Sequence, residues 1–156
     1  MQRENIFMKE AIELSLANVR DGGGPFAAVV VRNSTVIGRG VNRVTSTNDP
    51  TAHAEVVAIR EACRAINNFQ LNDCELYTTC EPCPMCLGAI YWARPSKIYF
   101  ANSRNDAARI GFDDSLIYEE IGRSFADRKI PSEQLMREEA LAAFQEWEKK
   151  SDKIRY

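Results

Sequence analysis

The stretch Cys80-Glu81-Pro82-Cys83-Pro84-Met85-Cys86 decides the fold, because it leads from an apolar strand into a helix and holds three of the chain's five cysteines. Leu76 to Thr79, just before it, are predicted to be a strand, and the helix that follows extends to about Ala93. Proline is favoured at the first helical position, so Pro84 makes Cys83 the N-cap and puts Cys86 on the same face. Both sulfurs then lie at a helix N-terminus, where the macrodipole favours the thiolate form.

Apolar periodicity and turn residues place the other elements around this stretch. A first helix ends at Asp21-Gly22-Gly23-Gly24-Pro25, a hairpin follows, and a second helix begins near His53. Two strand-helix-strand units in succession predict parallel pairing with right-handed crossovers, so we expect a single α/β domain over residues 1–156 with helices on both faces of one mixed sheet. The remaining predicted elements are strands at 26–31, 35–44 and 97–101 and helices at about 105–110 and 138–150.

Three uses of the clustered cysteines compete: a disulfide framework, a closed structural metal site, and an open metal site that performs chemistry. The N-terminal stretch MQRENIFMKEA has no apolar region of signal-peptide length, so we expect a cytoplasmic protein. Disulfides rarely persist in a reducing cytosol, which disfavours the first use. Cys63 and Cys74 are expected to be small buried apolar residues.

The second helix also begins with residues that suit a metal site. His53, the only histidine, and Glu55 fall in or beside its first turn, and the predicted topology brings His53 close to Cys83 and Cys86. One imidazole and two thiolates suit a tetrahedral zinc whose fourth position is open to water. The pattern H-x-E followed by P-C-x-x-C is the signature of zinc deaminases. Alternatively, Cys80 supplies a fourth ligand to a closed Cys₃His site that only stabilises an interaction module, which leaves Glu55 without a task.

Longer segments carry a resemblance to a known family. DPTAHAEVVAIREAC and YTTCEPCPMCLGAIYWAR resemble the bacterial guanine deaminases of the cytidine-deaminase-like superfamily, and so do GGPF, GFDD at 111–114 and the terminal Tyr156. The resemblance implies a three-layer α/β/α fold with a central mixed sheet of five strands. It also implies one zinc per chain, held by His53, Cys83 and Cys86, with Glu55 as the proton shuttle. The implied reaction is hydrolysis of guanine to xanthine and ammonia.

The same resemblance implies how a purine base is bound. Asn42 is expected to hydrogen-bond the ring, although asparagine is also common in turns. Phe26 and Trp92 are expected to sandwich the base, the alternative being that they are core residues. The segment 115–156 is expected to be exchanged between the subunits of a homodimer, so that Asp114 and Tyr156 reach the purine bound by the neighbouring chain; the alternative is a frayed terminus.

Charge and hydropathy favour a small substrate over a polymer. The formal net charge is −2 and the sequence pI is about 5.5, so no nucleic-acid partner is expected, and no apolar run is long enough to cross a membrane. Deamination of guanosine is the nearest rival activity, followed by deamination of adenosine in tRNA.

Overall fold

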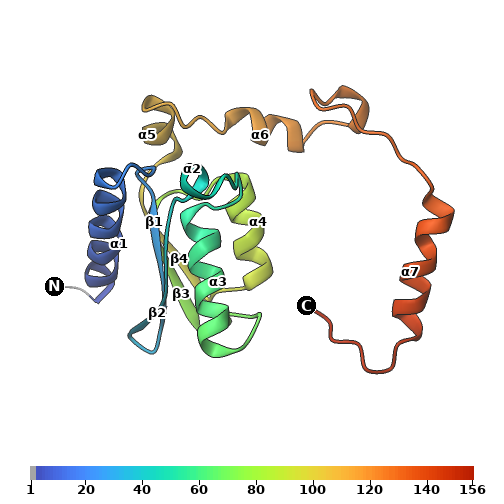
Figure 1. Cartoon of the computed structure of the whole chain (residues 1–156), viewed down its shortest axis with the longest axis horizontal. Helices are drawn as coiled ribbons and strands as arrows, with labels where there is room; N and C mark the ends of the chain where they lie inside the picture. The colour runs from blue at the N-terminus through green and yellow to red at the C-terminus, as the bar shows by residue number, and fades with distance from the viewer. Residues whose placement is uncertain (1–2) are drawn as a thin grey trace. The chain divides into compact units, whose positions relative to one another are not determined.

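The computed structural model describes residues 3–156, and the chain divides into two compact units, residues 1–114 and 115–156. The first unit contains all the strands of the described residues (Figure 1). Its elements in chain order are α1 Arg3–Arg20, β1 Ala27–Arg32, β2 Thr35–Val41, α2 Val44–Thr47, α3 Ala54–Ile66, β3 Cys74–Cys80, α4 Pro84–Ala93, β4 Lys97–Asn102 and α5 Arg104–Arg109.

One mixed sheet has the strand order β2-β1-β3-β4. β1 is antiparallel to both β2 and β3, whereas β3 and β4 are parallel and joined through α4. The predicted parallel strand-helix-strand unit is therefore confirmed for β3-α4-β4. The parallel pairing predicted for the other unit, β2-α3-β3, is wrong, because β1 lies between β2 and β3 and these two strands do not pair.

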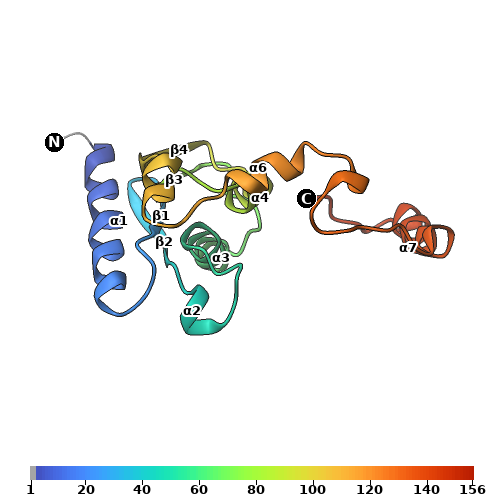
Figure 2. The same cartoon turned by 90° about the horizontal axis from the view of Figure 1, so that it is seen from above.

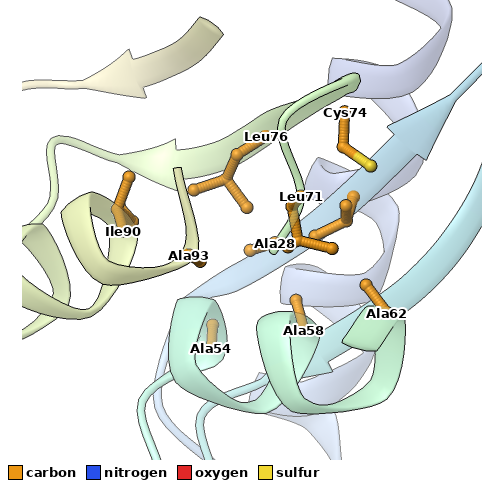
Figure 3. Packing of buried hydrophobic residues seen from close by; sticks show 10 residues of the cluster. Ala28, Ala54, Ala58, Ala62, Leu71, Cys74, Leu76, Ile90 and Ala93 are labelled. Carbon is orange, nitrogen blue, oxygen red and sulfur yellow. The ribbon is translucent and has the colours of Figure 1, made fainter. Parts of the chain in front are cut away.

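Helices cover both faces of this sheet, as Figures 1 and 2 show. α1 packs on one face through Phe7 and Ala11, which contact Val29, Val31 and Tyr77. α3 and α4 pack on the other face around a buried cluster (Figure 3). The predicted α/β fold with three layers is confirmed.

Glycines in β2 allow α3 to approach the sheet closely. A Cβ on Gly40 would clash with the carbonyl oxygen of Ala54, and one on Gly38 would lie 2.5 Å from the carbonyl oxygen of Ala58. Small residues on both sides thus let the helix backbone contact the strand directly. This packing fixes the N-terminus of α3, where His53 lies.

The second unit contains α6 Ser115–Ile121, the 3-10 helix η1 Phe125–Asp127 and α7 Arg137–Lys149. Residues 128–136 between η1 and α7 form no strand. The five strands implied by the family resemblance are therefore not confirmed, since the described residues contain four. After β4 a capping box at Ser103 and Asp106 starts α5, so the chain continues as helix instead of adding a strand.

Of the helices in residues 3–156, none has the length and apolar character that a membrane crossing requires.

Candidate metal and catalytic site

Two helix N-termini provide the side chains of the candidate site. His53 is the N-cap of α3 and Cys83 is the N-cap of α4, both with extended backbone, and Pro84 occupies the first turn of α4. The His53 side chain makes no N-cap hydrogen bond to α3, so its ring remains available to other partners. Both predicted helix starts are confirmed.

Three ligand atoms converge at this point. The Nδ1 atom of His53 lies 3.6 Å from the sulfur of Cys83 and 3.5 Å from that of Cys86, and all three ligand atoms lie within 4.8 Å of one another. Among residues 3–156 no other cluster of His, Cys, Asp and Glu side chains meets this criterion. The donor set, one imidazole nitrogen and two sulfurs, suits a tetrahedral zinc with one further position.

Cys80 does not belong to this group. It ends β3, as predicted, and its sulfur lies 3.7 Å from the carbonyl oxygen of Ser103. Burial raises the pKa of its thiol to about 11. The closed four-ligand site is therefore not supported. All five cysteines are free, so no disulfide framework exists.

The three ligand side chains shift one another's pKa values. A hydrogen bond from Cys86, together with a smaller effect of His53, lowers the pKa of Cys83 to about 4. The same hydrogen bond, together with burial, raises the pKa of Cys86. The pKa of His53 is raised because its ring hydrogen-bonds Cys83. The lowered pKa of Cys83 favours its thiolate, which is the form that binds a metal ion.

Glu55 lies beside the sulfurs, in the first turn of α3. Its side chain is buried, and its two carboxylate oxygens accept hydrogen bonds from the Thr78 hydroxyl (3.0 Å) and the Cys86 thiol (3.3 Å). Burial raises the pKa of this carboxyl group above its usual range. A carboxyl group with a raised pKa beside a metal site suits general acid and base work near neutral pH.

Thr78 is a site residue that sequence reasoning missed. It lies in β3, is 1% exposed and orients Glu55 through its hydroxyl. The signal available was a pair of threonines, Thr78 and Thr79, at the end of an otherwise apolar buried strand. Because a buried hydroxyl requires a hydrogen-bond partner, the pair indicated a polar neighbour but not its identity.

Asn42 and Phe26 lie together at one edge of the first unit. The backbone N–H of Asn42 donates to the carbonyl of Phe26 at 3.0 Å, and the Asn42 Oδ1 accepts from Val44 N–H at 3.3 Å. The ring of Phe26 meets that of Phe112 edge to face, with centroids 4.9 Å apart. Phe112 belongs to the GFDD segment but was not singled out as a site residue.

Asp114 lies near the cysteines of its own chain. Burial raises the pKa of its half-buried carboxyl group, and the negative charge of Cys83 raises it further. Asp114 also belongs to the same compact unit as the metal ligands. Its expected contact with the purine stays a prediction.

The other two residues predicted to bind substrate have exposed side chains. Trp92 is 62% exposed and lies in the last turn of α4, six residues beyond Cys86, which is roughly 9 Å along a helix axis. Tyr156 is 70% exposed and belongs to the second unit. Their contacts with a base stay predictions.

Comparison with known proteins places this arrangement in a family. Residues 1–102, which include all three ligand residues and Glu55, match the family model described as the cytidine and deoxycytidylate deaminase zinc-binding region. The chain belongs to this family.

Several members of this zinc deaminase family are similar over most of the chain. Guanine deaminase from Bacillus subtilis strain 168 is 52% identical over 151 residues, which cover 96% of this chain and 97% of that protein. The X-ray structure of guanine deaminase from Bacillus subtilis superimposes with a TM-score of 0.95 at 52% identity, covering 97% of this chain and 98% of that one. A tRNA-specific adenosine deaminase from Buchnera aphidicola subsp. Schizaphis graminum is 40% identical over 70% of this chain and 73% of its own length.

Proposed function

We propose that this protein is a zinc-dependent hydrolase that deaminates guanine to xanthine and ammonia. The observation that carries the proposal is the 52% identity to a guanine deaminase over nearly the whole chain, including most of the second unit. The similarity to the adenosine deaminase is lower and covers less of the chain. The net charge of −2 also disfavours RNA, since phosphate contacts supply much of the affinity in RNA binding.

One zinc per chain is proposed, held by His53, Cys83 and Cys86. The convergence of their ligand atoms within 4.8 Å and the low pKa of Cys83 support this assignment. A bound zinc acidifies water from a pKa of 15.7 to about 7 and so supplies a nucleophile at neutral pH.

Glu55 is proposed to carry the protons of the reaction. Its ionised carboxylate takes a proton from the attacking water and transfers it to a ring nitrogen of guanine as the water oxygen bonds to C2. The second proton of the water leaves with the amino group, so that guanine and water give xanthine and ammonia. The hydrogen bond from Thr78 supports this role, because it holds Oε1 in place while Oε2 lies 3.3 Å from the sulfur of Cys86, beside the proposed metal ligands.

Five side chains are proposed to recognise the purine. Because the Asn42 Oδ1 accepts from Val44, its amide nitrogen is the group available to donate to a ring acceptor. Phe26, braced by Phe112, offers an apolar ring face, and the Asp114 carboxylate can accept from the N–H donors that guanine presents. Trp92 and Tyr156 complete the proposed set, from surfaces that are exposed in a single chain.

A homodimer that exchanges residues 115–156 is also proposed. No residue of this unit is buried, and its helix α7 leaves Phe144 71% exposed and Trp147 43% exposed. A helix of this length is marginal in water unless its apolar face is packed. The division of the chain after Asp114 supports exchange of this whole unit, with Tyr156 closing the partner's pocket. A cytoplasmic location is proposed, consistent with a purine base as substrate.

The test is to measure ammonia release from guanine, guanosine, adenine, cytosine and a tRNA anticodon stem by the zinc-loaded protein. We expect the highest kcat/KM with guanine, and loss of turnover after chelation that returns with zinc. A higher kcat/KM with guanosine or with RNA would refute the assignment, because specificity is the ratio of these constants. If the zinc-loaded protein has no turnover and chelation unfolds it, the result would support a structural zinc module instead.

A further inference from the structure

Asn18 makes a contact that neither the metal site nor the sheet requires. It lies in the last turn of α1, half-buried, and its amide nitrogen donates two hydrogen bonds. One goes to the carbonyl of Gly24 at 2.8 Å and the other to the carbonyl of Asn42 at 3.0 Å. A primary amide has two N–H groups, so both donors of Asn18 are used. One side chain therefore ties a helix, the turn after it and the end of β2 together.

Two glycines of the turn, Gly23 and Gly24, lie close to asparagine side chains. A Cβ on Gly23 would clash with the amide of Asn18, and one on Gly24 would lie 3.2 Å from Cγ and Oδ1 of Asn42. The backbone of the turn thus packs directly against two asparagine side chains. Neither glycine has a positive φ, so the absence of a side chain matters here for space and not for backbone conformation.

The tied segments carry two of the proposed purine contacts. Phe26 follows the turn directly, and its carbonyl accepts from the backbone N–H of Asn42. Asn42 is consequently held through its N–H by Phe26, through its carbonyl by Asn18 and through Oδ1 by Val44. The Val44 bond orients the side-chain amide, and the other two bonds hold the backbone that carries it. Removing the Asn18 bond frees the backbone that sets this orientation and the path of the turn before Phe26.

We infer that Asn18 is a positioning residue, which fixes Asn42 and Phe26 in the geometry needed to bind the purine. The inference rests on the proposed function. It requires a neutral side chain that donates twice, because a carboxylate at this position would face two carbonyl oxygens. An apolar side chain would remove the Asn18 donor from the half-buried Asn42 carbonyl and leave the Gly24 carbonyl with the Phe26 N–H alone.

The test compares Asn18→Leu, Asn18→Asp and Gly23→Ala with the wild type. Gly23→Ala is informative because it displaces the Asn18 amide without altering Asn18, Asn42 or Phe26. All three variants should keep their zinc and raise KM for guanine about tenfold, the scale of one lost partly buried hydrogen bond, while kcat changes less. Hydrogen exchange at the backbone amides of Gly22, Gly23, Phe26 and Asn42 should accelerate in each.

Glu10→Gln is the matched control. It breaks an exposed ion pair between Glu10 and Arg39, whose atoms are 2.7 Å apart and which also joins α1 to β2 but away from Asn42. This variant should leave KM and the exchange at Asn42 unchanged.

The outcomes separate this inference from the proposed function. Unchanged KM in the Asn18 variants of an active enzyme, or an equal rise in KM in Glu10→Gln, would overturn the positioning role. If the wild type does not deaminate guanine, the proposed function fails; Asn18 is then judged by hydrogen exchange, and unaltered exchange at Asn42 would refute the tie itself.

Discussion

Replacing Thr78 by valine removes one hydroxyl from the site and keeps the shape of the side chain. In the structure this hydroxyl donates to Glu55 Oε1 at 3.0 Å, and both residues are buried. The bond stabilises the ionised carboxylate more than the protonated one, because the carboxylate is the stronger acceptor. Its loss therefore makes Glu55 harder to ionise.

The size of the effect follows from the charge on the acceptor. A hydrogen bond to a charged group contributes about 1.5–3 kcal/mol, and 1.36 kcal/mol corresponds to one pKa unit. If Glu55 must be ionised to accept the proton of water, the acid limb of kcat/KM should move to higher pH by about one to two pH units in Thr78→Val. Above this limb the variant should recover most of its turnover, since Glu55 itself is intact.

Ammonia release from guanine measured against pH, at constant zinc content, checks this prediction. Thr79→Val is the matched control, because the neighbouring Thr79 hydroxyl accepts from the backbone N–H of Ala27 at 3.0 Å and does not contact Glu55. The control should lose about 1–3 kcal/mol of unfolding free energy from the unpaired N–H without moving the acid limb. An unmoved limb in Thr78→Val, or equal movement in both variants, would refute the assignment of Thr78 and Glu55.

Four further outcomes follow from the same site. Glu55→Gln should keep zinc, measured by metal analysis, and lose at least about 10²–10⁴ in kcat, because only the proton carrier is removed. The pKa of Glu55 is raised above its usual 4.5, so the folded protein without metal keeps a proton that the unfolded chain releases. The free energy of unfolding by urea should therefore fall as pH rises from 4.5 through the folded-state pKa. Glu55→Gln should lack this fall. Cys80→Ser should retain zinc and activity, whereas Cys83→Ser should lose both. Deleting residues 153–156 should lower kcat/KM without changing zinc content. Refolding the truncated chain together with the Glu55→Gln chain should restore activity, because one pocket of the mixed dimer then combines an intact Glu55 with a donated tail.

Each of these has a contradicting result. Activity in Glu55→Gln would refute Glu55 as the proton carrier. If the free energy of unfolding changes with pH in the same way in the wild type and in Glu55→Gln, the raised pKa of Glu55 would be refuted. Loss of zinc in Cys80→Ser would favour the closed four-ligand site. Normal kcat/KM after truncation would refute the closing role of the tail, and a mixture no more active than its components would refute exchange between subunits.

The sequence by itself determined the parts of this protein that depend on neighbours in the chain. Pro84 after Cys83 specified a helix start with both sulfurs at its N-terminus, and the spacing His53-Ala54-Glu55 did the same for the second helix. Capping and periodicity act within a few residues, so the starts of these two helices and the candidate ligands could be predicted from the chain alone. The helices α2 and α6 were not predicted.

Only the tertiary structure decided which distant residues meet. Residue identity alone did not link Thr78 to Glu55 or Asn18 to Asn42, because the two pairs are 23 and 24 residues apart in the chain. The fold brings each pair within hydrogen-bond distance. The position of β1 between β2 and β3 was likewise hidden, since a hydrophobic pattern shows that a strand is buried but not which strand is its neighbour. Asp114 near Cys83 is the same case, because the two residues lie far apart in the chain and no local pattern brings them together.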